Sequence, residues 1–259
     1  MTAQQPPRLR QGIPLAINGL QKAFGERQVL RDINLHIPAG QFVAIVGRSG
    51  CGKSTLMRLL AGLDQPTRGE VWLDGVLVDG PGADRGMVFQ SYTLFPWLTV
   101  EQNICFGLQE RGVNKAAQKE RSDYFINKVG LRGFEHHFPR QLSGGMQQRL
   151  AIAQALMKKP RILLLDEPFG ALDPGIRGDM HQLIRELWLQ QQLTIFMVTH
   201  DLKEGFALGS RLWVFDKTRH DPQSPQRYGA QITYDIPLQG GKLNAEDAAL
   251  LPQPEKTEQ

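Results

Sequence analysis

Cysteine and long hydrophobic runs are both scarce in this sequence, and each scarcity excludes a class of protein. The 259 residues include two cysteines, Cys51 and Cys105, so we expect neither a disulfide framework nor a cysteine metal site. The longest apolar runs, such as 42–46 and 162–165, are far shorter than the roughly 18–20 residues that span a bilayer. We therefore expect a protein of a reducing compartment, the cytoplasm or its equivalent, with no membrane-crossing helix.

An excess of one charge is also missing. The chain has 30 Lys and Arg residues and 26 Asp and Glu residues, and its net charge of +4 is spread along the sequence. This balance does not indicate a nucleic-acid partner, and a solvated surface of mixed charge is the simpler interpretation. The hydrophobic fraction of 41% excludes a disordered or collagen-like chain. Residues 1–12 hold two arginines with no apolar run behind them, which predicts a flexible tail and not a secretory signal.

Strand and helix patterns alternate along most of the chain. Residues 13–46 are rich in strand patterns, and residues 91–158 are helical, with a capping box at Thr99 and Gln102 and a cap at Asn114. The other expected elements are a helix over 56–63, a hairpin over 70–78, strands over 87–89, 161–165, 193–199, 211–215 and 231–236, and helices over 146–157, 176–192 and 201–208. Strands that alternate with helices indicate an α/β fold with a mostly parallel sheet.

A glycine-rich segment, GRSGCGKST, follows a buried strand and opens a helix with the spacing of a phosphate-binding loop. Glycines let backbone N–H groups converge on phosphate oxygens, and the helix N-terminus favours negative charge. Lys53 is expected to reach the β- and γ-phosphates, and the Ser54 hydroxyl to bind Mg²⁺. A plain strand-to-helix turn is the alternative interpretation. The candidate phosphate-binding residues are Gly47, Arg48, Ser49, Gly50, Cys51, Gly52, Lys53, Ser54 and Thr55.

Two carboxylates, Asp166 and Glu167, follow the apolar run at 162–165. In open α/β sheets, ligands bind at the C-terminal ends of the strands. Asp166 therefore suits the shell of a Mg²⁺ ion, and Glu167 can act as the general base that activates a water molecule. A helix cap or a solvated turn is the alternative for such a pair, and the presence of a phosphate-binding loop makes it the weaker one.

Six motifs occur together in one order. They are the phosphate-binding loop, Gln90 after MVF, LSGGMQQR beginning at Leu142, ILLLDEP, GALD ending at Asp173, and His200 in VTHD. Over about residues 13–215 the chain resembles the ATP-binding subunit of an ABC transporter. The resemblance implies a P-loop NTPase fold, with a mostly parallel core sheet, an N-terminal antiparallel β subdomain and an inserted helical subdomain.

The resemblance also implies a head-to-tail dimer, expected to be a homodimer, with two ATP molecules at its interface. Each ATP would lie on Lys53 and its loop in one subunit and be covered by Ser143, Gly144 and Gly145 of the other. A serine hydroxyl and glycine N–H groups at the start of a helix are suitable phosphate ligands. The same Gly-Gly turn also serves locally to begin the helix.

Four further roles are implied by the resemblance. Gln90 corresponds to a catalytic hinge residue that senses Mg²⁺ and water and links the core to the helical insertion. His200 corresponds to the switch residue that contacts the γ-phosphate. Asp173 belongs to a loop that contacts the opposite subunit and its nucleotide. Phe24 stands where the family carries an aromatic ring that stacks on adenine, although that ring is more often Tyr.

The resemblance further divides the chain into a core and its additions. The nucleotide-binding core would comprise 13–90 and 159–216, interrupted by a helical subdomain at 91–158 that carries LSGGMQQR. A tail at 1–12 and a C-terminal extension at 217–259 complete the expected organisation.

Three classes of ABC ATPase compete for this sequence: transporter, DNA-repair or chromosome-organising, and translation-linked. Repair types interrupt the core with coiled coil or zinc modules, and translation types carry two cores in tandem. This chain has one core and an insertion of about 70 residues. A transporter ATPase is therefore expected, and a non-transport ATPase that acts on nucleic acid is the alternative.

The entry to the helical insertion indicates the kind of transporter. Leu94, Phe95, Trp97 and Leu98 resemble the surface on which the coupling helix of a membrane subunit rests, although a core-facing aromatic cluster is the structural alternative. With LFPWLTV and LSGGMQQR, the chain resembles importer ATPases of the nitrate, sulfonate and taurine group. The resemblance implies separate permease subunits, indirectly a solute-binding protein, and a peripheral location on the cytoplasmic side of the inner membrane. The sequence after residue 211 resembles members associated with urea-carboxylase systems, which implies a urea- or guanidine-like solute.

Overall fold

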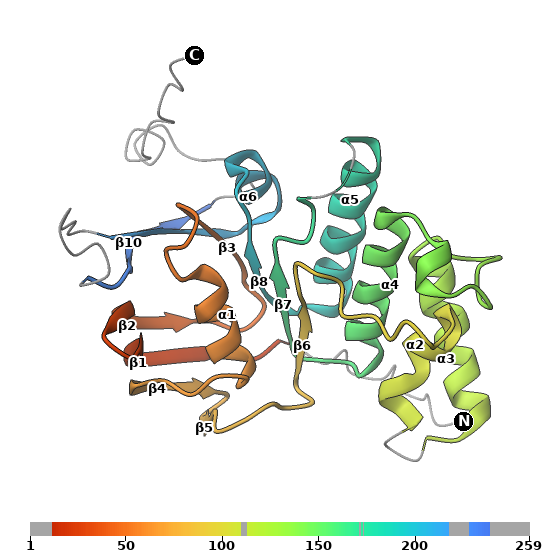
Figure 1. The fold of residues 1–259 in the computed structure, drawn as a ribbon, viewed down its shortest axis with the longest axis horizontal. Coiled ribbons are helices and arrows are strands. Elements are labelled where there is room, and N and C mark those ends of the chain that lie inside the picture. The colour runs from red at the N-terminus through yellow and green to blue at the C-terminus, as the bar shows by residue number, and fades with distance from the viewer. Residues whose placement is uncertain (1–11, 110–112, 171, 173, 218–227, 239–259) are drawn as a thin grey trace, which may run out of the picture.

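An antiparallel sheet forms the N-terminal part of the molecule (Figure 1). The computed structural model describes residues 12–109, 113–170, 172, 174–217 and 228–238. The strands of this sheet, in the order β2-β1-β4-β5, are β1 (Leu15–Phe24), β2 (Arg27–Ile37), β4 (Arg68–Leu73) and β5 (Val76–Leu77). Every neighbouring pair in it is antiparallel. The N-terminal antiparallel β subdomain expected from the sequence is therefore confirmed.

The core sheet has the strand order β10-β9-β3-β8-β7-β6. Its strands are β3 (Phe42–Gly47), β6 (Arg85–Val88), β7 (Ile162–Asp166), β8 (Thr194–Val198), β9 (Arg211–Asp216) and β10 (Gln231–Pro237). All neighbouring strands are parallel except β10 and β9, which are antiparallel. The prediction of a mostly parallel core is confirmed, and the strand expected at 231–236 is its antiparallel edge.

Helices join these strands. They are α1 (Lys53–Ala61), α2 (Val100–Gln109), α3 (Lys115–Lys128), α4 (Gly144–Met157), α5 (Pro174–Gln191) and α6 (Leu202–Leu208), with a 3₁₀ turn at Pro139–Gln141. The predicted capping box is present, because Thr99 N–H donates to Gln102 Oε1 at 2.9 Å and Gln102 N–H donates to Thr99 Oγ1 at 3.3 Å. The helix expected to begin at Met146 begins at Gly144, because Ser143 is its N-cap. In the described part of the chain, no helix is both long and apolar enough to cross a membrane.

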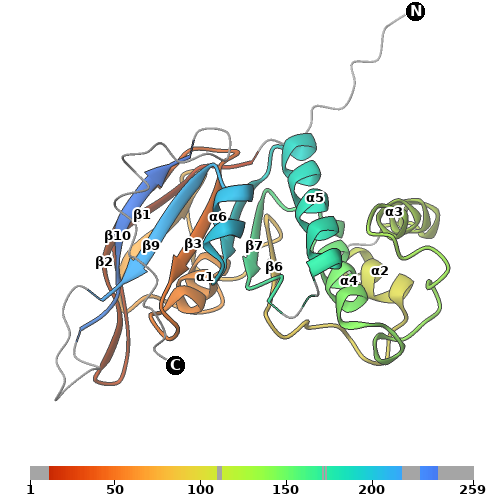
Figure 2. The same cartoon turned by 90° about the horizontal axis from the view of Figure 1, so that it is seen from above.

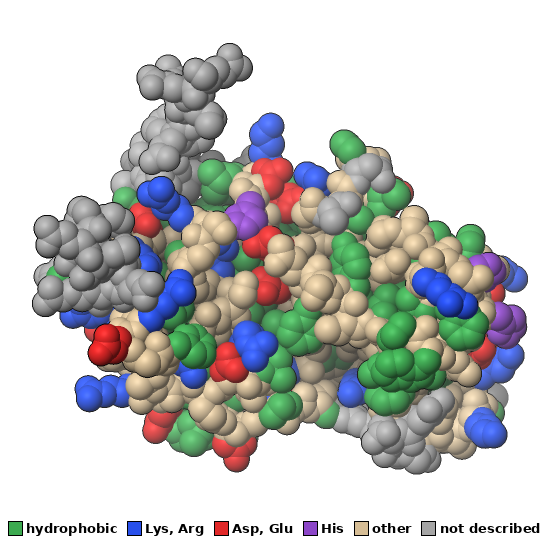
Figure 3. All heavy atoms as spheres, viewed as in Figure 1, with side chains coloured by type: hydrophobic (Ala, Val, Ile, Leu, Met, Phe, Trp, Pro, Cys, Tyr) green, Lys and Arg blue, Asp and Glu red, His purple; other side chains and the backbone are tan. Residues whose placement is uncertain are grey.

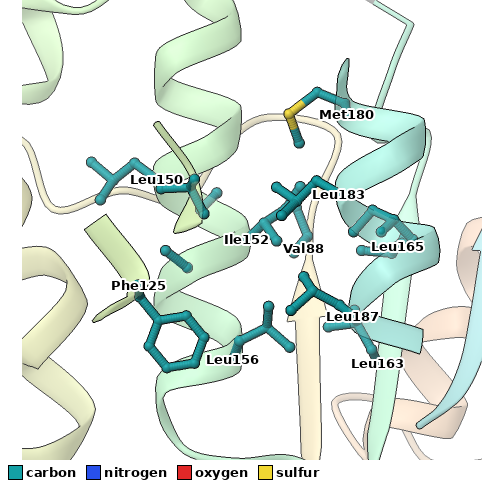
Figure 4. Packing of buried hydrophobic residues seen from close by; sticks show 14 of the residues in the cluster. Val88, Phe125, Leu150, Ile152, Leu156, Leu163, Leu165, Met180, Leu183 and Leu187 are labelled. Atoms are coloured by element: carbon teal, nitrogen blue, oxygen red, sulfur yellow. The ribbon is translucent and has the colours of Figure 1, made fainter. Parts of the chain in front are cut away.

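Apolar layers cover both faces of the core sheet. Because successive side chains of a strand point to opposite faces, Ile45, Leu164 and Phe196 pack with α1 and the antiparallel sheet. On the other face, Leu163 and Leu165 pack with α4 and α5, as the close view in Figure 4 shows. Figure 2 shows α2 and α3 beyond α4, at the end of the molecule opposite the antiparallel sheet. Burial on both faces explains why the core strands are continuous apolar runs in the sequence.

The core extends past both of the boundaries expected for it. Gly12, which the sequence assigns to the tail, is buried, and its N–H donates to the Gln192 carbonyl at 2.6 Å. In the expected C-terminal extension, β10 pairs with β9, and Asp235 forms an ion pair with Arg211 at 2.5 Å. The core sheet therefore includes β10 from the expected C-terminal extension, and a backbone hydrogen bond joins Gly12 to the turn after α5.

Candidate functional site

Two glycines shape the loop between β3 and α1. Gly47 and Gly52 have backbone φ angles of 153° and 100°, values that residues with a side chain rarely adopt. A Cβ atom at Gly47 would lie 2.3 Å from the Phe215 carbonyl oxygen, and one at Gly52 would lie 2.8 Å from Leu30 Cδ2. Phe215 belongs to β9 and Leu30 to β2, so elements from both sheets hold the loop in its conformation.

Lys53 is the first residue of α1, and its ammonium group lies within this loop. The residue is 5% exposed, and its Nζ donates hydrogen bonds to the carbonyl oxygens of Gly47 at 2.8 Å and Arg48 at 3.0 Å. The charge lies at the N-terminus of a helix, where backbone N–H groups point outward and the dipole is positive. The loop therefore presents a cation and N–H donors, which together suit a phosphate group.

Cys51 occupies a buried position in the same loop. Its Sγ lies 4.0 Å from Lys53 Nζ. Burial raises the pKa of the Cys51 thiol, although the neighbouring Lys53 charge acts in the opposite direction. The thiol is therefore neutral near pH 7 and a weak nucleophile, which agrees with a space-filling role.

Ser54 and Asp166 meet at the carboxyl end of β7. The Ser54 hydroxyl donates a hydrogen bond to Asp166 Oδ1 at 3.1 Å. Burial raises the pKa of Asp166, and the hydrogen bond from Ser54 lowers it in part. A hydroxyl and a carboxylate are the hard oxygen ligands that Mg²⁺ prefers, and Mg²⁺ commonly takes its other ligands from substrate phosphates and water. The pair therefore fits this ion.

Glu167 lies between two side chains that the sequence predicted to share its site. Its Oε2 accepts a hydrogen bond from Gln90 Nε2 at 2.9 Å, and its Oε1 lies 2.5 Å from His200 Nε2. Its backbone φ is +50°, an uncommon value for a residue with a side chain, and its N–H donates to the Val198 carbonyl at 3.0 Å. Gln90, Glu167 and His200 follow the parallel strands β6, β7 and β8, whose carboxyl ends lie at one edge of the sheet.

A cleft of about 380 Å³ joins the loop to these side chains. Its lining residues are Phe24, Arg27, Val29, Ser49, Gly50, Gly52, Lys53, Ser54, Thr55, Gln90, Glu167 and His200. Phe24 is 52% exposed at the end of β1, with Lys22 Nζ 4.7 Å from the centre of its ring. The cleft thus combines an exposed aromatic ring, a cationic loop and a polar cluster, which are the parts that a nucleotide requires.

The structure does not bring Ser143, Gly144 and Gly145 into this cleft. Ser143 is the N-cap of α4, and its Oγ accepts a hydrogen bond from the Met146 N–H at 3.3 Å. Gly144 is exposed with open space where a Cβ would lie, whereas Gly145 is buried and its Cβ would lie 2.9 Å from Ile176 Cγ2. These residues therefore lie apart from the cleft, with open space at the Cβ position of Gly144 and packing against that of Gly145.

Comparison with known proteins identifies the family of this chain. The family model described as ABC transporter matches residues 30–170. The chain belongs to the ABC transporter family. Its similarity extends to the aliphatic sulfonates import ATP-binding protein SsuB 2 of Pseudomonas fluorescens, which is 53% identical over 212 residues, covering 82% of this chain and 77% of the relative. The nitrate import ATP-binding protein NrtD of Synechocystis is 46% identical over 227 residues, covering 86% and 83%.

Solved structures of ABC cassettes share the fold. The dimeric structure of MJ0796, a bacterial ABC transporter cassette, has a TM-score of 0.76 and 31% identity, covering 87% of this chain and 99% of that chain. A dimeric post-hydrolysis state of the same cassette bound to ADP and phosphate has a TM-score of 0.74. The expected ABC ATPase fold is therefore confirmed, and this ABC protein is an ATPase subunit.

The residues predicted for the site and the residues found there differ in a few places. Asp173, expected to contact the opposite subunit, lies outside the described residues. Arg27 and Val29 line the cleft but were not predicted from the sequence, because they reach it through the pairing of β2 with β1. Thr199 and Glu204, which line a second pocket together with Glu167 and His200, were not predicted either, and the sequence signal for them is their proximity to His200.

The two glycines of LSGGMQQR, Gly144 and Gly145, should differ in their contribution to the stability of this ABC protein. Gly145→Ala is expected to lower the free energy of unfolding by about 1–3 kcal/mol, because its Cβ would overpack against Ile176. Gly144→Ala, where space is open, should change it by less than about 0.5 kcal/mol. Urea denaturation of the two variants measures the difference. Equal destabilisation by both would contradict the packing assigned to Gly145.

Proposed function

We propose that this ABC protein hydrolyses ATP at two sites shared between paired subunits and thereby drives import of a small solute through separate permease subunits. The observation that carries the proposal is the division of the ATP site. Lys53, Glu167 and His200 lie at one cleft, whereas Ser143 and Gly144 are exposed at the start of α4 and do not line it. A half-site of each kind on one chain is completed when a second copy binds head-to-tail about a two-fold axis.

Each half-site has a distinct task in this proposal. The phosphate-binding loop, Gly47 to Thr55, and the Lys53 ammonium bind the β- and γ-phosphates, and Phe24 stacks on the adenine. Ser54, Asp166 and Gln90 hold Mg²⁺, which when bound neutralises charge on the phosphate oxygens.

The polar cluster carries the chemistry. Glu167 accepts a proton from the attacking water as general base, and Gln90 orients that water. His200 donates to the γ-phosphate when it turns from Glu167 toward the nucleotide. Across the interface, the Ser143 hydroxyl and the N–H groups of Gly144 and Gly145 cover the same phosphate, and Asp173 contacts the partner's site. Closure of the dimer therefore depends on the γ-phosphate, and hydrolysis releases it.

An exposed aromatic group before α2 is proposed to contact the permease. The Trp97 side chain is 69% exposed, and its ring centre lies 5.7 Å from that of Phe95, which in turn lies 4.3 Å from Phe106. Figure 3 shows hydrophobic side chains gathered over the helical part of the molecule. Leu94 by contrast packs partly against the core, so the alternative of a core-facing cluster holds for that residue. Exposed aromatic residues of this kind are common at the centre of protein interfaces.

Trp97→Ala should reduce the stimulation of ATPase activity by reconstituted permease by about tenfold or more, the size expected for loss of a buried aromatic anchor. Basal ATPase activity of the chain should be unchanged, because Trp97 does not line the nucleotide cleft. Comparison of the ATPase rate with and without permease in proteoliposomes measures this effect.

Leu189→Ala is the matched control, since Leu189 is 61% exposed but lies on α5 beside Gly12 and Gly40. Full permease stimulation of the Trp97 variant would remove the docking role.

Duplex DNA is added in a parallel assay of the unmodified chain. Stimulation by DNA and not by permease would favour the nucleic-acid alternative and overturn import.

The solute is proposed to be a small oxyanion of the sulfonate or nitrate kind, because relatives of 53% and 46% identity are named for import of these compounds. The protein would then act at the cytoplasmic face of the inner membrane, with the solute delivered by a separate binding protein. The urea- or guanidine-like solute indicated by the C-terminal sequence remains a second prediction, and residues 218–227 and 239–259 of that region lie outside the described chain. Calorimetric titration of the partner binding protein with taurine, nitrate, urea and guanidine distinguishes the two.

A further inference from the structure

Glu204 on α6 is the centre of a buried polar network beside His200. It is 6% exposed, and its Oε2 accepts a hydrogen bond from the Thr199 hydroxyl at 2.6 Å. Its Oε1 lies 3.4 Å from His181 Nε2 and 3.7 Å from Arg177 Nε, both on α5. Burial acts to raise the pKa of Glu204, but its net pKa is lowered by His181, Thr199 and Arg177. The carboxylate is therefore ionised at neutral pH, and its partners compensate for its burial.

The Thr199 hydroxyl acts both as a hydrogen-bond donor and as an acceptor, and it thereby connects Glu204 with Asp201, the residue after His200. The hydroxyl donates to Glu204 and accepts a hydrogen bond from the Asp201 N–H at 3.0 Å. The Thr199 backbone N–H donates to the Ile45 carbonyl at 3.0 Å. The residues before and after His200 are therefore anchored to the core, although the His200 side chain itself is 48% exposed.

The network also reaches the segment before α5. Arg177 Nη2 donates to the Leu172 carbonyl at 3.1 Å. The His181 ring meets Phe169 edge-on, with ring centres 4.7 Å apart, and Phe169 is two residues after Glu167. One set of contacts thus links the segment that follows Glu167 with the segment that carries His200.

A pocket of about 310 Å³ borders the network on one side. Its lining includes Glu167 and His200 together with Arg177, Thr199 and Glu204. Glu204 lines the same pocket as Glu167 and His200. A displacement of Glu204 can therefore be accompanied by a displacement of the His200 side chain. A side chain as exposed as His200 depends on its backbone anchors for orientation, because little packing restrains it.

We propose that Thr199 and Glu204 are positioning residues that hold the backbone of His200 in place through the hydroxyl bridge, so that its side chain can reach the γ-phosphate. This inference rests on the proposed roles of Glu167 and His200. Neither Thr199 nor Glu204 lines the nucleotide cleft, so both act on the reaction through His200 and not by contact with ATP.

Thr199→Val removes the hydroxyl and keeps the shape of the side chain. We expect kcat for ATP hydrolysis by the full chain to fall about tenfold, with KM for ATP within about twofold, because orientation and not binding is lost. Thr199→Ser should restore most of kcat, since it returns the hydroxyl. Glu204→Met should lower kcat similarly, whereas Glu204→Gln, which keeps an acceptor oxygen for Thr199, should lose less than about threefold.

The double variant Thr199→Val with Glu204→Met decides whether both act through one bridge. If they do, it should lose about tenfold, the same as either single variant, whereas independent effects would multiply to about a hundredfold. A hundredfold loss would overturn the shared role.

Thr194→Val is the matched control for removal of a buried threonine hydroxyl. Thr194 lies at the opposite end of β8, where its hydroxyl donates to the Ile13 carbonyl at 2.8 Å and accepts from the Gly40 N–H at 3.0 Å. It should lower the thermal unfolding midpoint without lowering kcat. If Thr199→Val and Thr199→Ser lose kcat only in proportion to their loss of folded protein, the role is structural and the inference is wrong.

His200→Ala separates failure of this inference from failure of the proposed function. If His200→Ala loses activity and Thr199→Val does not, the positioning role is wrong and the proposed function stands. If His200→Ala retains full kcat, the proposed role of His200 itself is wrong.

Discussion

Replacing Glu167 with glutamine should abolish steady-state ATP hydrolysis while the chain still binds ATP. Loss of a general base reduces kcat by about 10²- to 10⁴-fold, and the amide cannot accept the proton of the attacking water. The substitution keeps the size of the side chain, and the amide oxygen still accepts a hydrogen bond from His200 or Gln90 in place of the carboxylate. The fold and the ATP cleft should therefore remain intact.

The same variant should accumulate as an ATP-bound dimer. The γ-phosphate is needed to join the two half-sites, and without hydrolysis it is not removed. Size-exclusion chromatography with ATP and Mg²⁺ should show a dimer for the variant and a smaller dimer fraction for the unmodified chain. Glu70→Gln is the matched control, because Glu70 is an exposed carboxylate on β4 whose partner is Trp72. Normal ATP turnover by the Glu167 variant would exclude Glu167 as the base.

The sequence predicted best the parts of the site that depend on local structure. The phosphate-binding loop lies within nine residues, and its strand, glycines and helix start are all visible in the sequence. Asp166 and Glu167 were placed by the simple rule that ligands bind at the carboxyl ends of parallel strands. The contact of Ser54 with Asp166 across 112 positions follows from that rule.

Contacts that depend on strand order could not be derived from residue patterns. Periodicity gives no reason for β8 to lie between β3 and β7, yet this order brings His200 to Glu167. The parallel pairing of β3 with β8 and β9 likewise joins strands far apart in the sequence. Long-range pairing of this kind is set by the packing of whole faces, which a single strand pattern does not encode.

Helix α4 begins two residues earlier than its apolar pattern predicted. Apolar periodicity begins at Met146, so the helix was expected there, but Ser143 caps it two glycines earlier. Glycine is unfavourable within a helix and contributes no periodicity, so the pattern alone gives the later start. The structure explains one of the two glycines by packing, at Gly145, and leaves Gly144 exposed for the proposed contact with nucleotide.

Replacing Lys53 with alanine should abolish ATP binding. The ammonium is the charged group at the centre of the loop, and a charge-assisted hydrogen bond contributes about 1.5–3 kcal/mol, or more where two phosphate oxygens are bound. Loss of that interaction corresponds to an increase in Kd of at least about tenfold to a hundredfold. Isothermal titration with ATP in the presence of Mg²⁺ measures the change, and hydrolysis should be lost with it.

Arg58→Ala is the matched control for removing a positive charge from α1. Arg58 lies on the same helix but is exposed and paired with Asp64 at 2.8 Å, away from the cleft lining. Its removal should leave the Kd for ATP within about twofold, because a solvent-exposed charge outside the site is strongly screened. If both variants weaken ATP binding equally, the net charge of the helix and not the position of Lys53 determines affinity. If neither does, phosphate binding by this loop is contradicted, because the Lys53 ammonium is the buried charge that the loop holds among its carbonyl groups.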